Sequence, residues 1–279
     1  MKLKKNYIHS NKRQIFRLIP TDTDKLIIEE RETDKKQAFF NCLNIESGKK
    51  IFNDFQLDEK YWVGIEDTYR DVIFFHKFGK PDLPQHHGII AFDINLQKTL
   101  WENEEHSFLF IKEGKVYSYR QKFEGREFFT IDWQTGKVME ELGTDAASLN
   151  LIREEVIASK YISGYKFPEV YDQSAGLNNN ADEILKTLRE KHLITGKIEF
   201  VLMNDLLMFN FHEIAGRNLL NNIFKAVDLS NEKYILEEAL NSGTQAFAPD
   251  SFFVKDDLLF LLIDRTKLGV YKIINNIVQ

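Results

Sequence analysis

The sequence predicts an all-β protein, a single β-propeller over residues 1–279 with five blades, six being the alternative. The main observation is a repeat, because residues 61–142 hold two consecutive units of four apolar or alternating runs each. Self-similarity at a period of this length is typical of blade-type β arrays. The composition agrees, since 23 Phe and 10 Tyr supply side chains that favour pleated, half-buried surfaces.

The predicted strands are runs rich in β-branched and aromatic residues, separated by turn residues. In chain order they are 14–19, 25–31, 37–45 and 50–52; 61–66, 72–78, 88–94 and 98–103; 107–112, 115–121, 126–133 and 137–142; 197–203 and 206–212; and 251–255, 257–263 and 268–273. The last group, 251–273, has three strands where a complete blade has four. The missing strand would leave an open edge with unpaired backbone groups. We expect residues 2–9 to supply the missing outer strand, with Leu3, Tyr7 and Ile8 as packing residues. The alternative is that the tail 276–279 supplies it.

A repeated phrase closes each unit: an apolar pair, an Asp or Asn, an apolar residue, a turn, a Lys and an apolar strand. The acidic or amide residue is Asn44, Asp93, Asp132 or Asp228 in the four copies. Such side chains accept hydrogen bonds from backbone N–H groups two residues on, so we assign them a structural role. Trp101, which ends the second copy, is expected to be buried between adjacent blades.

The gap between Asp132 and Asp228 is about twice the others, so either one blade has degenerated inside it or an insertion lies there. We favour a mainly helical insertion at 145–196. Apolar residues recur at helical spacing in 146–159 and 181–192. The segment between them is rich in aromatic residues: Tyr161, Tyr165, Phe167 and Tyr171. If exposed, these side chains would form a surface for a partner; if buried, which we favour, they would seal the insertion onto the strands.

The composition excludes several classes of partner. A net charge of −6 argues against nucleic acid. No run approaches the roughly 18 apolar residues of a membrane helix, and no apolar segment of a secretion signal follows the basic start at 1–5. Cys42 is the only cysteine, so no disulfide forms within the chain. We expect a cytoplasmic monomer with no membrane contact.

The phrases around Trp101 and at 133–137 resemble the blade endings of quinoprotein-like and WD-repeat-like β-propellers. That fold hosts enzymes, cofactor binders and scaffolds alike, so the resemblance implies no activity. The whole chain also resembles a family of uncharacterised bacterial proteins known as a domain of unknown function. The phrases IIEERE, GIIAFDINLQKTLW and FPEVYDQS carry this likeness. No quinone-binding motif accompanies them, and we expect no cofactor.

Three histidines and Asp82 lie within a stretch of twelve residues, and imidazole is a common metal ligand. The segment 79–88 is interpreted as an irregular loop that would not fix ligand geometry, and no H-E-x-x-H helix supports it. We therefore expect no metal site, and we expect loop residues to contact a ligand. The candidate ligand-binding residues are His76, His86, His87, Tyr165 and Tyr171.

The favoured function is a non-catalytic binding or scaffolding module for an unidentified protein or small molecule. The alternative is a glycan-acting hydrolase with carboxylates in the central channel, since glycosidases use two acids. Paired acids occur at 29–30, 66–67 and 256–257. Adjacent strand residues point to opposite faces, so no pair acts as a unit, and we expect these acids at solvated strand ends. No G-x-S-x-G elbow is present.

Overall fold

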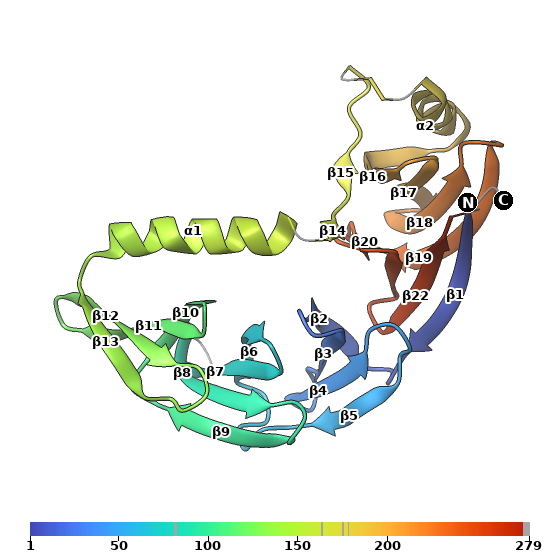
Figure 1. Cartoon of the computed structure of the whole chain (residues 1–279). Helices are drawn as coiled ribbons and strands as arrows, with labels where there is room; N and C mark the ends of the chain where they lie inside the picture. The colour runs from blue at the N-terminus through green and yellow to red at the C-terminus, as the bar shows by residue number, and fades with distance from the viewer. Residues whose placement is uncertain (81–82, 163, 175, 178, 276–279) are drawn as a thin grey trace. The chain divides into compact units, whose positions relative to one another are not determined.

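Antiparallel strands make up most of the computed structural model (Figure 1). The structure describes residues 1–80, 83–162, 164–174, 176–177 and 179–275. Within these ranges there are two helices, and no sheet closes on itself. The prediction of an all-β protein is therefore confirmed. Neither helix in the described ranges is long and apolar enough to span a membrane.

The chain divides into two compact units. One, Arg13–Ser163, is called the continuous unit; the other, Met1–Lys12 with Gly164–Gln279, is called the split unit. The boundary between them falls between the two helices, inside the segment 145–196. Each unit is described by itself.

The continuous unit holds three four-stranded antiparallel meanders followed by a helix. Its elements are β2 (Gln14–Pro20), β3 (Lys25–Glu32), β4 (Gln37–Asn44), β5 (Lys50–Phe55), β6 (Val63–Tyr69), β7 (Val72–Lys80), β8 (Leu83–Asp93), β9 (Lys98–Asn103), β10 (Ser107–Lys112), β11 (Lys115–Lys122), β12 (Gly125–Asp132), β13 (Val138–Gly143) and α1 (Ala146–Ile162). The second and third meanders join into one sheet through a parallel pair between Ser107 and Gly88.

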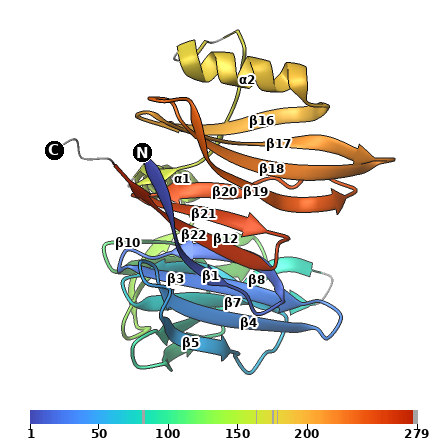
Figure 2. The ribbon, with the colours of Figure 1, turned by 90° about the vertical axis from the view of Figure 1, so that its right-hand side faces the viewer.

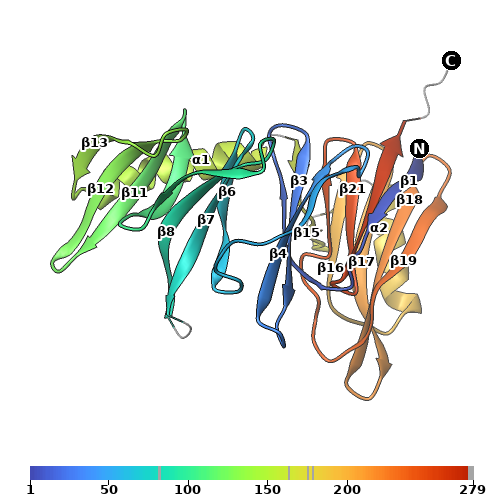
Figure 3. The ribbon, with the colours of Figure 1, turned by 90° about the horizontal axis from the view of Figure 1, so that it is seen from below.

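Strand β7 is apolar on both faces because a neighbouring meander covers each face. Ile73 and Phe75 belong to the core shared with the first meander. Phe74 belongs to the core shared with the third meander. Because successive strand residues point to opposite faces, the run 72–75 is continuously apolar. Figure 3 shows β6, β7 and β8 side by side.

Trp101 lies between the second and third meanders but is only half-buried. Its Nε1 donates to the carbonyl oxygen of Trp133 over 2.9 Å. A Cβ at Gly136 would lie 2.7 Å from the Trp101 ring, and Gly136 also has a φ of 71°. The predicted packing is confirmed, whereas full burial is wrong because one side of the indole remains accessible.

The repeated Asp and Asn residues form the predicted turns. Asp93 Oδ1 accepts from the backbone N–H groups of Asn95 and Leu96 at 2.9 and 2.7 Å. Asp132 Oδ1 accepts in the same way from Thr135 N at 2.8 Å. These side chains fix the hairpins that set the strand register.

The split unit contains two further sheets and a helix. Its elements are β1 (Lys2–His9), β14 (Tyr165–Lys166), β15 (Glu169–Val170), α2 (Asn179–Lys191), β16 (Ile194–Met203), β17 (Leu206–Gly216), β18 (Leu219–Asp228), β19 (Lys233–Thr244), β20 (Phe252–Lys255), β21 (Leu258–Ile263) and β22 (Lys267–Ile274). Helix α2 lies against one face of the β16–β19 sheet (Figure 2), with Leu185 and Leu188 in the shared core. Both helices fall within the segment where the sequence predicts them.

Strand β1 pairs antiparallel with β22, from Lys2 opposite Ile274 to His9 opposite Leu268. The prediction that residues 2–9 supply an outer strand is thus confirmed. Leu3 packs against the core, as expected. Ile8 does not, because it is 49% exposed on the outer face of the strand. The tail 276–279 lies outside the described residues.

Candidate functional site

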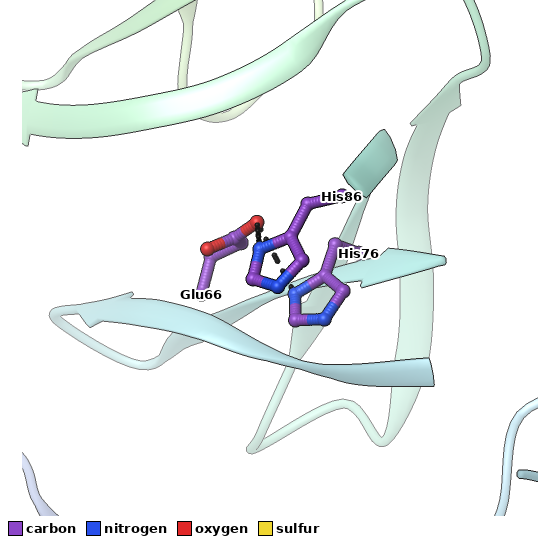
Figure 4. Close-up of side chains that lie close together, drawn as sticks. All are labelled: Glu66, His76 and His86. Carbon is purple, nitrogen blue, oxygen red and sulfur yellow. Dashed lines mark hydrogen bonds and ion pairs between the residues drawn. The ribbon is translucent and has the colours of Figure 1, made fainter. Parts of the chain in front are cut away.

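Glu66, His76 and His86 converge from three neighbouring strands, β6, β7 and β8 (Figure 4). The Nδ1 atoms of both histidines face one carboxylate oxygen, Glu66 Oε1, at 3.2 Å from His76 and 2.8 Å from His86. The two imidazole rings stack with their centroids 3.6 Å apart and their planes 6° apart. One carboxylate and two imidazoles therefore share a single point of approach.

Local backbone features place Glu66 and His76 together. Glu66 is the extra residue of a bulge in β6, because Ile65 pairs with Phe75 and Asp67 pairs with Phe74. Bulges of this kind re-aim side chains. Opposite His76 stands Gly64, where a Cβ would lie 2.8 Å from the imidazole ring. A glycine at this position gives the imidazole its space.

A second bulge selects which of the tandem histidines joins the cluster. Between the pairs Phe75–Ile90 and Lys77–His87, two residues of β8 oppose one of β7, and one of the two is Gly88 with a φ of 71°. The shift sets His86, rather than its neighbour, opposite Phe78 and on the face of His76. Without the bulge the alternation of strand side chains would have placed His87 there.

The cluster is buried on one side and accessible on the other. The side chain of His76 is 2% exposed, that of Glu66 14% and that of His86 40%. Burial of the Glu66 carboxyl group opposes its ionisation, but the imidazoles of His76 and His86 outweigh burial and lower its pKa to about 2. Burial lowers the pKa of His76, and Glu66 opposes that shift only in part. At neutral pH the cluster therefore holds an ionised carboxylate and a neutral His76.

His76 is poorly satisfied for a buried polar side chain. Neither ring nitrogen makes a hydrogen bond of good geometry in the described residues, although Nδ1 lies near Glu66. The Phe78 ring meets the imidazole edge to face, with the centroids 4.9 Å apart. The positive charge of Arg17 further disfavours protonation of His76. A buried polar atom without a partner costs free energy, so a ligand that pairs with it is favoured.

A pocket of about 540 Å³ opens beside the cluster, within the continuous unit. Its lining residues are Glu66, Gln85, His86, Phe108, Leu109, Tyr119, Arg126 and Arg153. The two arginines are exposed, and neither has an ion-pair partner in the described part of the chain. Arg126 lies over the Tyr119 ring at 4.2 Å. Ligand pockets commonly have volumes of about 300–1,000 Å³ and combine apolar walls with a few polar groups.

The structure separates the other histidine candidate from this site. The expected irregular loop at 79–88 is mostly strand, because β7 extends to Lys80 and β8 begins at Leu83. His87 points to the opposite face of β8, where its Nε2 lies 3.7 Å from Glu104 Oε2 on the exposed surface. Asp82 lies outside the described residues.

The two tyrosine candidates belong to the split unit. Tyr171 is 4% exposed, and its hydroxyl donates to Asp182 Oδ1 over 2.6 Å, so it seals α2 onto the strands. Tyr165 is half-buried and stacks on Phe167 with the ring centroids 5.6 Å apart. Tyr171 therefore has the packing role that the sequence favoured for the aromatic segment, whereas Phe167 is 48% exposed and does not. The side chain of Tyr161 is outside the described part of the structure.

The expectation of solvated strand ends is wrong for the acids at 29–30. Both Glu29 and Glu30 are fully buried, and each forms an ion pair with an arginine. Glu29 Oε1 lies 2.6 Å from Arg31 Nη2, and Glu30 Oε2 lies 3.2 Å from Arg13 Nη1. Glu66 is also largely buried, whereas Asp256 is exposed as expected.

Sequence reasoning missed three residues of the site: Glu66 as a partner of the histidines, and Arg126 and Arg153 as pocket residues. The spacing of Glu66 from His76 carries no motif, since they lie on different strands of a hairpin. The arginines come from β12 and α1, far along the chain. Their meeting depends on how the third meander packs against the second.

Comparison with known proteins adds a family match and no activity. No curated protein matches the sequence. Among solved structures, a europium-containing methanol dehydrogenase is similar, with 11% sequence identity and a TM-score of 0.31. The match covers 95% of this chain and 52% of the dehydrogenase chain, so this chain spans about half its length. A likeness at this level identifies neither a cofactor nor a reaction. Residues 19–101, which contain Glu66, His76 and His86, match the family model described as a domain of unknown function (DUF4905), as the resemblance predicted.

Proposed function

We propose that the protein is a non-catalytic binding module whose ligand is a small anion, bearing carboxylate or phosphate groups. The observation that supports this function is the pocket, whose lining includes Arg126 and Arg153 as well as Glu66 and His86. Guanidinium groups bind carboxylate and phosphate through paired hydrogen bonds. Phe108 and Tyr119 supply apolar surface for the body of the ligand.

The proposed framework is a single β-propeller of five blades. Support comes from five groups of four antiparallel strands: β2–β5, β6–β9, β10–β13, β16–β19, and β20–β22 with β1. The last group combines strands from both ends of the described chain, as a ring closed by its N-terminal strand requires. In this proposal the short strands β14 and β15 and the two helices are additions to the blades.

A glycan hydrolase remains the alternative, and the pocket favours it less. Glycosidases of the usual kind need two carboxyl groups flanking the bond, one of them protonated. Glu66 is the only acid among the residues that line the pocket, and its lowered pKa keeps it ionised. The buried acids Glu29 and Glu30 are held in ion pairs with arginines.

We also propose a monomer in the cytoplasm that acts on a dissolved ligand. Cys42, the only cysteine, is a buried free thiol, and burial raises its pKa to about 12. A thiol of this kind is unreactive, and a reducing compartment suits a protein without disulfides.

The test is anion binding by the full-length chain after treatment with EDTA. Calorimetry and thermal unfolding are measured with inorganic phosphate, citrate and succinate as probes. A ligand that binds only the folded state at 100 times its dissociation constant stabilises it by about 2.7 kcal/mol. We expect at least one probe to stabilise the wild type and to lose this effect in the variant Arg126→Gln/Arg153→Gln.

The matched control is Arg217→Gln, since Arg217 is an exposed arginine of the split unit and does not line the pocket. This variant should bind like the wild type. Absence of binding by every probe, or equal binding in the double variant, contradicts the proposal. Release of reducing sugar from a glycan by the wild type, lost in Glu66→Gln, would favour the hydrolase instead.

A further inference from the structure

We propose that Glu66, His76 and His86 bind a divalent transition-metal ion, with Zn²⁺ as the best match. The ion would sit in the wall of the pocket, where Glu66 and His86 are accessible. This inference deepens the proposed function, and it rests on that function only for the anion that completes the coordination.

The donor set suits such an ion. The three ligand atoms lie within 4.8 Å of one another, two being imidazole nitrogens and one a carboxylate oxygen. Zinc binds imidazole nitrogen and carboxylate oxygen at about 2.0–2.2 Å, and sites with three protein ligands keep a further position open. Imidazole ligands favour zinc and related metals over Mg²⁺ and Ca²⁺, which prefer oxygen.

The contacts among Glu66, His76 and His86 favour a cation placed between their ligand atoms. Two imidazole Nδ1 atoms face the same Glu66 oxygen, which leaves only one acceptor for two ring nitrogens. A cation placed between these atoms would interact with all three at once. It would also give Nδ1 of His76 a partner, which that buried ring lacks in the described residues. A neutral imidazole that binds the ion through Nδ1 carries its ring proton on Nε2.

The surrounding backbone and side chains hold the three ligand atoms in place. The bulge at Glu66, the glycine opposite His76 and the bulge at Gly88 each orient one of the three side chains. Phe78 packs edge to face against both imidazoles, at 4.9 and 5.3 Å. Ligands held in this way lose little freedom when an ion binds.

The charges around the cluster indicate what completes the coordination. A divalent ion exceeds the single negative charge of Glu66, and Arg17 adds positive charge near His76. Arg126 and Arg153 add more on the pocket side. An anionic ligand in the pocket would therefore bind the open metal position and the guanidinium groups together. Metal and anion should raise each other's affinity.

The test is the binding of ZnCl₂ and CoCl₂ to EDTA-treated full-length protein. Calorimetry counts the ions, and the visible spectrum of Co²⁺ reports nitrogen coordination. We expect one ion per chain in the wild type. We expect His86→Ala to weaken binding at least about 10-fold, since even outer-shell changes have effects of 10–100-fold. Glu66→Gln should weaken it as well while preserving the shape of the side chain.

The matched control is His87→Ala, which removes the adjacent histidine, of similar exposure, from the other face of β8. It should bind zinc like the wild type. Three results overturn the inference: no binding at one ion per chain, unchanged affinity in His86→Ala, or an equal loss in His87→Ala. Unchanged affinity in His86→Ala would mean that zinc binds elsewhere, and an equal loss in His87→Ala would mean that it binds the two exposed histidines without the cluster.

Failure of this inference can be told apart from failure of the proposed function. If anions bind the EDTA-treated wild type and zinc does not bind, the metal site is wrong and the anion pocket stands. If zinc binds through His86 while no anion binds in its presence or absence, the proposed function is wrong and the metal site stands.

Discussion

His76 in the continuous unit and Asn210 in the split unit occupy the same position in two copies of the repeat. Each lies four residues beyond the one that pairs with the repeated aspartate, Asp93 in one copy and Asp228 in the other. Both side chains are almost completely buried, at 1% exposure. Both copies therefore place a polar residue inside the protein at this position, and they differ in what surrounds it.

Around Asn210 the neighbours are neutral and pair with one another. Its Nδ2 donates to Asn222 Oδ1 over 3.0 Å, and Asn222 Nδ2 donates to Ser251 Oγ over 2.8 Å. The serine in turn donates to the carbonyl oxygen of Ala248 over 2.7 Å. Neutral buried networks of this kind fix the packing of neighbouring strands.

Around His76 the neighbours are ionisable and open to a pocket. Glu66 and His86 bring a negative charge and a second imidazole, and both line the pocket. The comparison teaches that burial of a polar residue does not by itself identify a site. Both His76 and Asn210 carry a buried atom without a hydrogen-bond partner in the described residues, so that feature does not separate them. The ionisable neighbours and the access to solvent do, and these are features of a binding site.

Removal of residues 1–10 should have the largest effect on stability, and it tests the proposed β-propeller framework to which both copies belong. The deletion takes β1 from β22 and exposes an unpaired edge. We expect a loss of several kcal/mol, a large part of the roughly 5–15 kcal/mol that stabilises a domain. Urea unfolding followed by circular dichroism measures it. All three tryptophans, Trp62, Trp101 and Trp133, lie in the continuous unit. Their fluorescence therefore shows whether the deletion also destabilises that unit, as the proposed ring would require. An unchanged midpoint contradicts the pairing.

Asn222→Ala tests the neutral network alone. The substitution leaves Asn210 Nδ2 without its acceptor and removes a partner of Ser251. We expect a loss of about 2–3 kcal/mol, since a buried donor without a partner costs about 1–3 kcal/mol and a small cavity adds to this. Zinc and anion affinities should be unchanged. A weaker zinc affinity in this variant would show that the two copies are not independent in function.

Gly64→Ala tests the space that the imidazole occupies. The added Cβ would lie 2.8 Å from the His76 ring, so we expect a loss of about 1–3 kcal/mol from overpacking and a weaker zinc site. The control is Gly216→Ala in β17, where a Cβ meets no atom within 4 Å and the φ is not positive. This change should be neutral or stabilise by up to about 1 kcal/mol. Equal changes in stability at both glycines would show that Gly64 is not needed to leave space for the His76 imidazole.

Acid should weaken the EDTA-treated protein in two steps, and the first step, at the histidines, should have the smallest effect of the series. Burial lowers the pKa values of His76, His106 and His212 below 6.5, so the unfolded chain takes up protons first. Their contribution is complete above pH 6.5 and declines as the pH falls below it. The Glu66 pKa is lowered from 4.5 to about 2, so its contribution is lost between these values.

The variant His76→Asn, which introduces the residue of the split unit, should reduce the first step in the continuous unit. Tryptophan fluorescence during urea unfolding at pH 7 and pH 5 measures this step. A free energy of unfolding that is higher at pH 5 than at pH 7 would contradict the lowered pKa values of these histidines.

Much of the fold was predictable because its signals are local. The strands β9 and β10 begin and end where alternation places them, and the turn at Asp93 has the hydrogen bonds that its side chain predicts. The outer strand β1 was predicted because the last group of strands lacked a fourth strand and would otherwise have an open edge. Helices α1 and α2 followed from apolar spacing.

The site was not predictable because it depends on single-residue shifts and tertiary packing. The bulge at Gly88 decides that His86 and not His87 joins His76, and the pattern of the sequence fits both registers. Arg31, the partner of Glu29, donates to the carbonyl oxygens of Tyr61 and Val63, contacts far along the chain that no local pattern describes. Arg153 reaches the pocket only because α1 packs on the third meander.

The most direct test of the central claim is a crystal structure of the full-length protein grown with Zn²⁺, with anomalous data at the zinc absorption edge. We expect one strong anomalous peak within about 2.0–2.2 Å of Glu66 Oε1 and of Nδ1 of His76 and His86. We expect no anomalous peak at the Asn210 network. A structure with no peak at Glu66, or with zinc only between His87 and Glu104, would contradict it.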